Sequence, residues 1–388
     1  MKNTKIKNNT IIKRNIMKFN KIYYISISLA FLLILLFFVI ANIINNDKEF
    51  SEIENRNLQE KPKILSENYV EKLNSYMADQ FFIREKLISF KSRIDLVLGK
   101  NKINNVYIGS DNQLFEEFKI TSNDDLFNKV DVINEFKKAN EDLLVNFMLV
   151  PTATSILDDK LPLYAPVDDE IEYINNVKSY LLDDIKFIPI YDKLKANKNE
   201  YIYYKTDHHW TTDGAYLGYE AFCESTGIEA TNKEDFEKII GSNDFYGSLS
   251  SKVGLFGLYK DKLNIYIPKN SNMLVNYVME QKKDTSLFNS DKLKHKDKYQ
   301  VFLNGNHPLI EIETDKNLDK KILVIKDSFA NNFVPFLTEN YGNIFLIDLR
   351  YYTESINEFI KNNDINEVLF LYNVNTFNED DSIFNLST

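Results

Sequence analysis

The last part of the chain alternates short apolar runs with amphipathic segments, and this alternation most constrains the fold. Residues 321–326, 344–347 and 368–372 are short and apolar, as buried strands are. Between them, residues 329–337 and 356–360 carry apolar side chains at helical spacing. Strands that alternate with helices pair in parallel through right-handed crossovers, with helices on both faces. The pattern therefore predicts a three-layer α/β/α domain around a parallel sheet.

The same alternation runs through the middle of the chain. Residues 145–150 are expected to form a strand, and residues 187–191 a second one, which Pro189 confines to a short or edge position. Helical spacing of apolar side chains precedes the first strand at residues 126–136 and separates the two strands at residues 171–181. These elements extend the predicted sheet.

Residues 228–318 break the alternation. They contain several glycines, serines and asparagines with short strand-like runs, so we expect an irregular, partly β insertion. Upstream, residues 69–98 are expected to form a helix, and residues 106–115 two strands joined by a turn. The prediction is a domain at 101–388, preceded by a stalk and helical linker at residues 47–100.

The N-terminal end has the features of a membrane anchor. Residues 1–21, a predicted cytoplasmic tail, hold six lysines, one arginine and no acid, and residues 22–46 carry no charge. About 20 apolar residues span a bilayer, and a basic flank keeps its end in the cytoplasm. A cleaved signal peptide is the alternative, but the apolar stretch exceeds the ~7–15 residues of a signal core and no small-x-small site follows. We expect an uncleaved single-pass anchor in the cell membrane, with the rest of the chain outside.

The charge balance and the cysteine count exclude several function classes. Seven of the 47 basic residues precede the span, so 40 remain against all 57 acidic residues, a balance of −17. This balance argues against nucleic acid as a partner and against tight contact with an anionic membrane surface. The single cysteine, Cys223, excludes an intramolecular disulfide, which suits a Gram-positive exterior. There is no glycine-rich phosphate loop, and no cofactor is predicted.

A candidate nucleophile follows the apolar run at residues 321–326. Ser328, preceded by Asp327, stands between this predicted strand and the helical segment at residues 329–337. A serine at such a turn is exposed at the carboxyl end of the sheet, close to the free N–H groups of the helix start. The alternative is that Asp327 or Ser328 only caps the helix.

A second candidate is the run of Asp207, His208, His209 and Trp210, which holds two of the four histidines and the only tryptophan. On an extended segment Asp207 and His209 face the same side and His208 faces away. A carboxylate beside an imidazole fixes its tautomer and stabilises its protonated form, as in a Ser-His-Asp triad. A helix start, a polar loop and a metal site are the alternatives, and for a metal the ligand supply is thin.

This Asp-His-His-Trp run resembles the name-giving motif of the DHHW proteins, which are similar to the SGNH-hydrolase-like alginate O-acetyltransferases. The resemblance implies that Asp207, His209 and Ser328 form a catalytic triad, in a chain order reversed relative to the usual SGNH order. One departure is Lys326, which stands where the SGNH block Gly-Asp-Ser usually has its glycine. It bears on the tightness of the turn and on the oxyanion geometry.

Other residues are expected to support the oxyanion or the substrate. Asn306, after Gly305, resembles the SGNH asparagine of the oxyanion hole, with an ordinary turn as the alternative. Arg350, beyond a predicted strand end, would bind a substrate carboxylate or hold its loop. The remaining expected support residues are His208, Trp210 and Tyr352.

The resemblance implies an extracytoplasmic O-acetyltransferase that modifies a polysaccharide through an acetyl-serine. An enzyme outside the cell has no obvious acetyl-CoA supply, so a multi-pass membrane O-acyltransferase is the implied acetyl donor. Two alternatives stay open: a carbohydrate O-acetyl esterase with the same triad, and a non-catalytic scaffold protein of the cell envelope.

The predicted topology has a direct test. We expect protease added to intact, wall-stripped cells to digest the chain from residue 47 onward, because the basic tail holds the N-terminus inside. Immunoblotting against the C-terminal domain measures the loss. Survival of that domain in intact cells, with digestion after lysis, would contradict the prediction.

Overall fold

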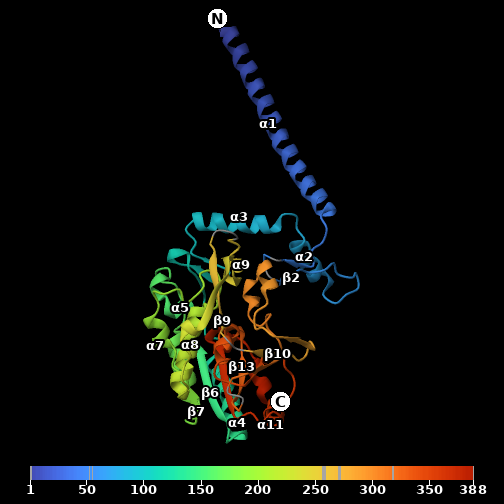
Figure 1. Ribbon diagram of the computed structural model, residues 1–388. Helices are drawn as coiled ribbons and strands as arrows, with labels where there is room; N and C mark the ends of the chain where they lie inside the picture. Colours follow the sequence, from blue (N-terminus) through green and yellow to red (C-terminus); the bar gives the residue numbers. More distant parts are fainter. Residues whose placement is uncertain are drawn as a thin grey trace. The chain divides into compact units, whose positions relative to one another are not determined.

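The computed structural model describes residues 2–387 apart from 52, 55, 256–258, 270–271 and 317–318. Packing divides the chain into two units (Figure 1). The first comprises Met1–Ser51 and Arg56–Ile88, and the second Glu52–Asn55 and Ser89–Thr388.

The first unit begins with helix α1 (Lys2–Ile44). Its segment Asn20–Ile44 has a mean hydropathy of 3.0 over its most apolar part, and it is long and apolar enough to cross a membrane. An anchor and a signal sequence both have these properties. The helix predicted at residues 69–98 is instead two helices, α2 (Tyr69–Asp79) and α3 (Arg84–Val97). They separate because Ile83 takes a positive φ of 55°, which no helix can accommodate.

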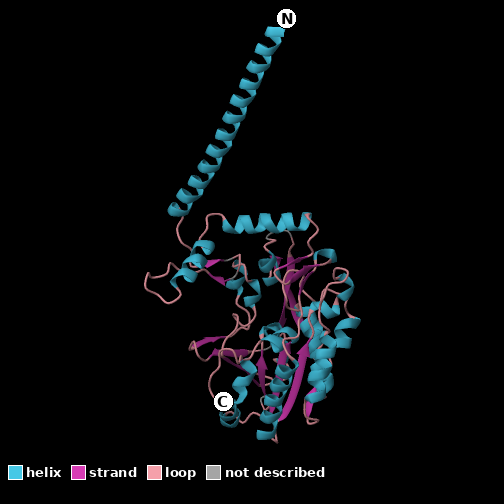
Figure 2. Ribbon diagram, turned by 180° about the vertical axis from the view of Figure 1, so that it is seen from behind, coloured by secondary structure: helices cyan, strands magenta, loops and turns pink. Residues whose placement is uncertain are grey.

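The second unit is built on an eight-stranded sheet, seen edge-on in Figure 2. In spatial order the strands are β11 (Lys282–Asp284), β10 (Met273–Tyr277), β12 (Leu309–Thr314), β14 (Asn343–Ile347), β13 (Lys321–Lys326), β15 (Glu367–Asn373), β6 (Leu144–Val150) and β7 (Ile185–Phe187). The five strands from β14 to β7 are parallel, as predicted. The other three are antiparallel, so the sheet is mixed. Strand β7 ends before Pro189 and lies at the sheet edge, because proline cannot donate to a ladder.

Alternating side chains of the central strand β13 supply two cores, one on each face of the sheet. Ile322 and Val324 belong to the core on one face, and Leu323 and Ile325 to the core on the other. The first face is covered by α5 (Ala153–Ile156), α7 (Tyr191–Ala196), α8 (Thr212–Thr226) and α10 (Val334–Leu337). The second is covered by α4 (Asn123–Ala139), α6 (Glu170–Tyr180), α11 (Ile356–Asn362) and α12 (Val374–Glu379). These are the three layers that the sequence predicts.

The expected insertion at 228–318 is more regular than its composition suggests. Strands β8 (Phe236–Phe245) and β9 (Asp261–Pro268) form a separate antiparallel ribbon with two irregularities in register. Strands β10, β11 and β12 join the main sheet, because β12 pairs along its length with β14. Residues 256–258, 270–271 and 317–318 of this region lie outside the described residues.

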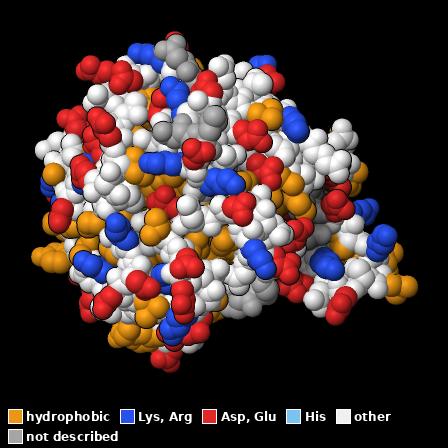
Figure 3. Space-filling view, turned by 60° about the horizontal axis from the view of Figure 1, so that its bottom comes forward, with side chains coloured by type: hydrophobic (Ala, Val, Ile, Leu, Met, Phe, Trp, Pro, Cys, Tyr) orange, Lys and Arg blue, Asp and Glu red, His pale blue; other side chains and the backbone are white. Residues whose placement is uncertain are grey.

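Two short structures complete the second unit. Strands β3 (Lys102–Ile103), β4 (Val106–Ile108) and β5 (Leu114–Glu116) form a small sheet. Helix α9 (Ser248–Val253) packs against it through an apolar cluster that includes Leu249 and Val253. On the face drawn in Figure 3, Asp and Glu side chains are interspersed with Lys and Arg, and no continuous basic area is visible among the described residues.

Candidate active site

The Asp-His-His-Trp run lies in a tight loop. Tyr203 and Trp210 pair as an isolated antiparallel bridge, and the Tyr204 N–H donates to the His209 carbonyl at 3.3 Å. The chain therefore bends back on itself between residues 205 and 209, and the extended segment assumed from the sequence is wrong. Thr211 then caps α8 by accepting from the Gly214 N–H.

Trp210 fixes this loop to the segment that follows Ser328. Its side chain is buried, and its indole N–H donates to the Phe329 carbonyl at 3.0 Å and to Asn332 Oδ1 at 2.8 Å. Asn332 returns a bond from Nδ2 to the Trp210 carbonyl at 3.2 Å. The indole also packs against α8 at Gly218, where an added Cβ would lie 2.7 Å from the ring. Trp210 thus holds the loop that carries His209 against the segment that follows Ser328.

Asp207 is buried and bonded on both carboxylate oxygens. Oδ1 lies 2.5 Å from His209 Nδ1 and also accepts from the His209 backbone N–H at 3.1 Å. Oδ2 accepts from the Ser248 backbone N–H at 2.7 Å, at the start of α9. A Cβ at Gly247 would lie 2.2 Å from the Asp207 Cβ, so only glycine permits this approach. These contacts hold the carboxylate in one orientation toward the imidazole.

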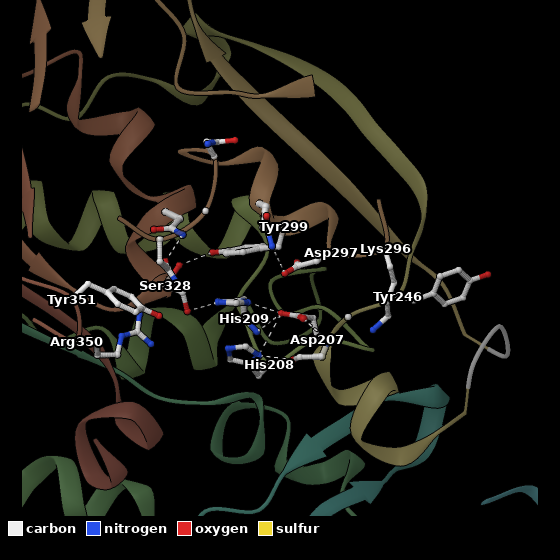
Figure 4. Close-up of a pocket in the computed structure, with 17 residues that line it drawn as sticks. Asp207, His208, His209, Tyr246, Lys296, Asp297, Tyr299, Ser328, Arg350 and Tyr351 are labelled. Carbon is white, nitrogen blue, oxygen red and sulfur yellow. Dashed lines mark hydrogen bonds and ion pairs between the residues drawn. The ribbon is translucent and has the colours of Figure 1, made fainter. Parts of the chain in front are cut away.

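Ser328 stands where the sequence predicts it, directly beyond β13. Its Oγ lies 2.7 Å from His209 Nε2, so the geometry is that of a serine, an imidazole and a carboxylate in series (Figure 4). Asp327 rather than Ser328 caps the following 3₁₀ turn (Ser328–Asn332), accepting from the Phe329 N–H at 2.8 Å. The Ser328 hydroxyl is therefore left for the pocket.

The electrostatics of the pair suit a general base. Burial lowers the pKa of His209 to about 4, and the nearby His208 adds to this effect, while Asp207 opposes it. Burial by itself would raise the pKa of the Asp207 carboxyl. The two neighbouring histidines and the hydrogen bonds of Asp207 have a larger, opposite effect, so the pKa of this carboxyl lies well below its usual range. Near neutral pH the pair therefore consists of an ionised Asp207 and a neutral His209 whose Nε2 can accept a proton.

Tyr299 was not predicted as a site residue. Its ring stacks on the His209 imidazole with centroids 3.8 Å apart and 10° between the planes, and its hydroxyl donates to the Ser328 carbonyl at 3.0 Å. It thus clamps both the imidazole and the serine backbone. Its local sequence is a charge-dense loop with no periodicity, so no sequence signal marks it.

His208 lines the same pocket as His209. Because the loop is bent, the two rings lie 3.9 Å apart instead of facing opposite ways. Its Nδ1 lies 2.6 Å from Ser248 Oγ. It is placed to influence the charge of His209 without contacting Ser328.

Lys326, the departure from the SGNH glycine, causes no backbone strain and has a defined place. It takes no positive φ, and its buried ammonium donates to Asn331 Oδ1 at 2.7 Å and to Asn306 Oδ1 at 3.4 Å. Asn331 Nδ2 donates to Asn306 Oδ1 at 3.0 Å. Since an ammonium can only donate, both amide oxygens must face it. Asn306, which lines the pocket, therefore turns its amide oxygen toward Lys326 and Asn331.

Arg350 was expected either to bind a substrate carboxylate or to hold its own loop, and its contacts favour the second role. Arg350 lines the pocket and donates twice to the buried Asp348, from Nε at 2.8 Å and from a terminal nitrogen at 2.6 Å. It therefore holds its loop, while its remaining edge faces the pocket. Tyr352 is not brought to the pocket: it is buried in the core and packs edge-on against Phe359. Its neighbour Tyr351 lines the pocket in its place.

These residues surround a polar cavity of about 510 Å³ (Figure 4). Lys296 and Asp297 contribute charge to its wall, and Tyr246 and Gln300 contribute hydrogen-bonding groups. A cavity of this size takes a sugar residue or a small ester. Asp207, His208 and His209 also place one possible ligand atom each within 4.8 Å of one another, as a metal site would. In this structure Asp207 Oδ2 and His208 Nδ1 bond Ser248, and His209 Nε2 bonds Ser328.

The fold and the residues around this cavity define a three-layer α/β protein with a mixed sheet and a serine, a histidine and an aspartate in hydrogen-bonded series. The model of the DHHW proteins matches residues 99–347, and the chain belongs to that family. A comparison with curated protein sequences finds no match.

Several solved structures are similar to this chain. A DHHW family protein from Eubacterium siraeum aligns with a TM-score of 0.65 and 24% identity, over 74% of this chain and 96% of that one. Bacillus cereus PatB1 with a sulfonyl adduct aligns with a TM-score of 0.60 and 25% identity, over 72% of this chain and 98% of its own. The O-acetyltransferase domain of Pseudomonas putida AlgJ aligns with a TM-score of 0.45 and 13% identity, over 71% of this chain and 93% of that one.

The lowered pKa of His209 predicts an unusual pH profile. If neutral His209 is the base, kcat/KM should fall only as the pH drops toward about 4, because burial keeps the imidazole unprotonated at pH 5–6. Hydrolysis of a soluble aryl acetate between pH 3.5 and 8 measures the midpoint. His208→Gln should move it upward, because that change removes the electrostatic effect by which His208 lowers the His209 pKa. A midpoint near 6.5 in the unsubstituted protein would show that His209 is not buried as described.

Proposed function

We propose that the protein is an extracytoplasmic, membrane-anchored O-acetyltransferase that acetylates a polysaccharide through Ser328. The observation that carries this is the series of contacts from Asp207 through His209 to Ser328, at 2.5 and 2.7 Å, inside a polar cavity. One contact places the imidazole of His209 where it can accept the proton of the Ser328 hydroxyl, and the other lets the Asp207 carboxylate orient that imidazole. Nucleophilic catalysis by a serine needs both arrangements.

The mechanism follows from these positions. His209 Nε2 takes the Ser328 proton while Oγ attacks the carbonyl carbon of an acetyl ester. The oxyanion that forms is stabilised by donors beside Ser328, for which the Asn306 amide is our candidate. When the intermediate collapses, the departing alcohol receives the proton from His209. A sugar hydroxyl then gives its proton to His209 and attacks the acetyl-serine. As the C–O bond to Ser328 breaks, His209 returns that proton to Ser328 Oγ, which leaves the acetylated sugar and the free serine hydroxyl.

The sulfonyl adduct of Bacillus cereus PatB1 supports this assignment by analogy. A sulfonyl group is transferred to an activated nucleophile in the same way as an acyl group, with loss of the leaving group to which it was bound. We infer that the equivalent chemistry of this chain takes place on Ser328, the hydroxyl that contacts His209.

A transferase fits the apolar helix better than an esterase does. An enzyme held at a membrane is placed to receive acetyl groups from a membrane-embedded O-acyltransferase, which we propose as the donor partner. A soluble esterase has no need of such an anchor. The acceptor is proposed to be a cell-surface or secreted polysaccharide, whose hydroxyl groups suit the polar lining of the cavity.

The nucleophile is tested by substitution. Ser328→Ala should lower aryl acetate hydrolysis on the order of 10⁴–10⁶-fold and abolish labelling by phenylmethylsulfonyl fluoride, read by peptide mass spectrometry. His209→Ala should match it, and the double variant should lose little more, because triad members act as a unit. His208→Ala should cost less, roughly 10–100-fold.

Ser290→Ala is the matched control. Ser290 also opens a 3₁₀ turn behind a capping side chain, Asn289, but it is exposed and does not line the cavity. It should retain full activity and labelling. Equal activity of Ser328→Ala and Ser290→Ala would exclude Ser328 as the nucleophile.

The ratio of acetylated sugar to free acetate distinguishes a transferase from an esterase. Purified protein given an acetyl ester and an oligosaccharide acceptor should form acetylated sugar faster than free acetate, with the ratio rising as acceptor is added. Mass spectrometry of the sugar and an acetate assay measure both products. Acetate release that dominates at every acceptor concentration, with loss of acetyl groups from native polymer, would establish the esterase instead.

A further inference from the structure

Helix α3 turns its apolar side chains outward and polar side chains inward. Its buried positions are Ser92 and Asp95. By contrast, Phe90 is 63% and Val97 88% exposed. A surface helix that serves only its own domain shows the reverse pattern, with an apolar stripe toward the core. The exposed large apolar residues in and just beyond the helix are Leu87, Phe90, Ile94, Val97 and Leu98.

The charges of α3 are arranged around this apolar face. At 100° per residue the five apolar side chains fall on one arc, with Lys86 and Arg93 at one margin and Lys91 at the other. These three basic residues are exposed, and the fourth of α3, Arg84, is half-buried. Of the acidic residues of α3, half-buried Glu85 lies on the opposite side, and buried Asp95 lies next to Lys91 and pairs with it at 2.9 Å. Within α3, all of which is described, the exposed arc is therefore apolar in its middle and basic at its margins.

We propose that this face of α3 lies in the headgroup region of the membrane that α1 is able to cross, as a helix parallel to the bilayer surface. Residues 45–83 separate the two helices along the chain, so α3 is tethered within reach of the bilayer that α1 is able to cross. Apolar side chains in the middle of the arc would reach the acyl chains, and basic side chains at its margins the phosphate groups. The exterior part of the chain is acidic as a whole, but this arc is not.

Packing connects α3 to the candidate site. Leu96, on the inner side of α3, packs against the apolar cluster that holds Leu249 and Val253 of α9. The first residue of α9, Ser248, bonds both Asp207 and His208. Helix α9 has six residues and is therefore about 9 Å long. If the proposed function holds, membrane docking through α3 keeps the acetyl-accepting serine close to a membrane-embedded donor.

The test measures the depth of α3 in lipid with the full chain. Val97→Cys and Phe90→Cys variants are labelled with a nitrobenzoxadiazole fluorophore and reconstituted into vesicles of phosphatidylcholine and phosphatidylglycerol in a 7:3 ratio. Leu163→Cys is the matched control, because Leu163 is also 88% exposed, in a loop of the second unit. The native Cys223 is buried, and the unsubstituted protein provides the labelling blank.

We expect doxyl lipids to quench the labels at positions 90 and 97 at least threefold more than the label at position 163, and aqueous iodide to show the opposite order. Equal quenching at all three positions would overturn the proposal. Protection from both quenchers at positions 90 and 97 would also overturn it, because a protein surface, such as a second copy, would then cover α3. Unchanged unfolding temperatures of the labelled variants confirm their fold. None of these readouts requires acetyl transfer, so the result does not depend on the proposed function.

Discussion

The site depends on one hydrogen-bonded junction between two distant parts of the chain. The buried indole of Trp210 donates to the segment after Ser328, and Asn332 returns a bond to the Trp210 backbone. This junction sets the 2.7 Å contact between the imidazole of His209 and the serine hydroxyl, although 119 positions of sequence separate those two residues. A buried donor and acceptor left without partners would cost about 1–3 kcal/mol each, so the two loops cannot separate cheaply.

A second constraint acts on the serine side of the cavity. Lys326 is a buried cation that can donate but not accept, and its ammonium also lies 4.0 Å from the carboxylate of Asp348. It hydrogen-bonds the amide oxygens of Asn331 and Asn306, and so orients both side chains. Burial lowers the pKa of Lys326 to about 8, so the ammonium is still charged near neutral pH. The residue that departs from the SGNH pattern thus has a positioning role instead of weakening the site.

The exposed apolar face of α3 and the cavity at Ser328 are connected by packing. Helix α3 carries its apolar face on one side, and on its other side Leu96 packs against the cluster that supports α9. Helix α9 begins at Ser248, which bonds the acid of the site. The surface proposed to contact lipid and the cavity proposed to bind an acyl group are therefore linked through a short stretch of packed side chains.

The sequence by itself determined the layers of the domain and the strand before Ser328, because periodicity and turn position are local properties. Asp207, His209 and Ser328 were candidates from their local setting, and the resemblance to the DHHW proteins joined them into one series. Tertiary structure alone decided the rest. The bend of the loop brought His208 beside His209, since backbone pairing between Tyr203 and Trp210 overrides the extended geometry assumed for adjacent residues. Pairing of β12 with β14 drew part of an irregular-looking insertion into the main sheet. Tyr299 entered the site only through packing, which no local pattern encodes.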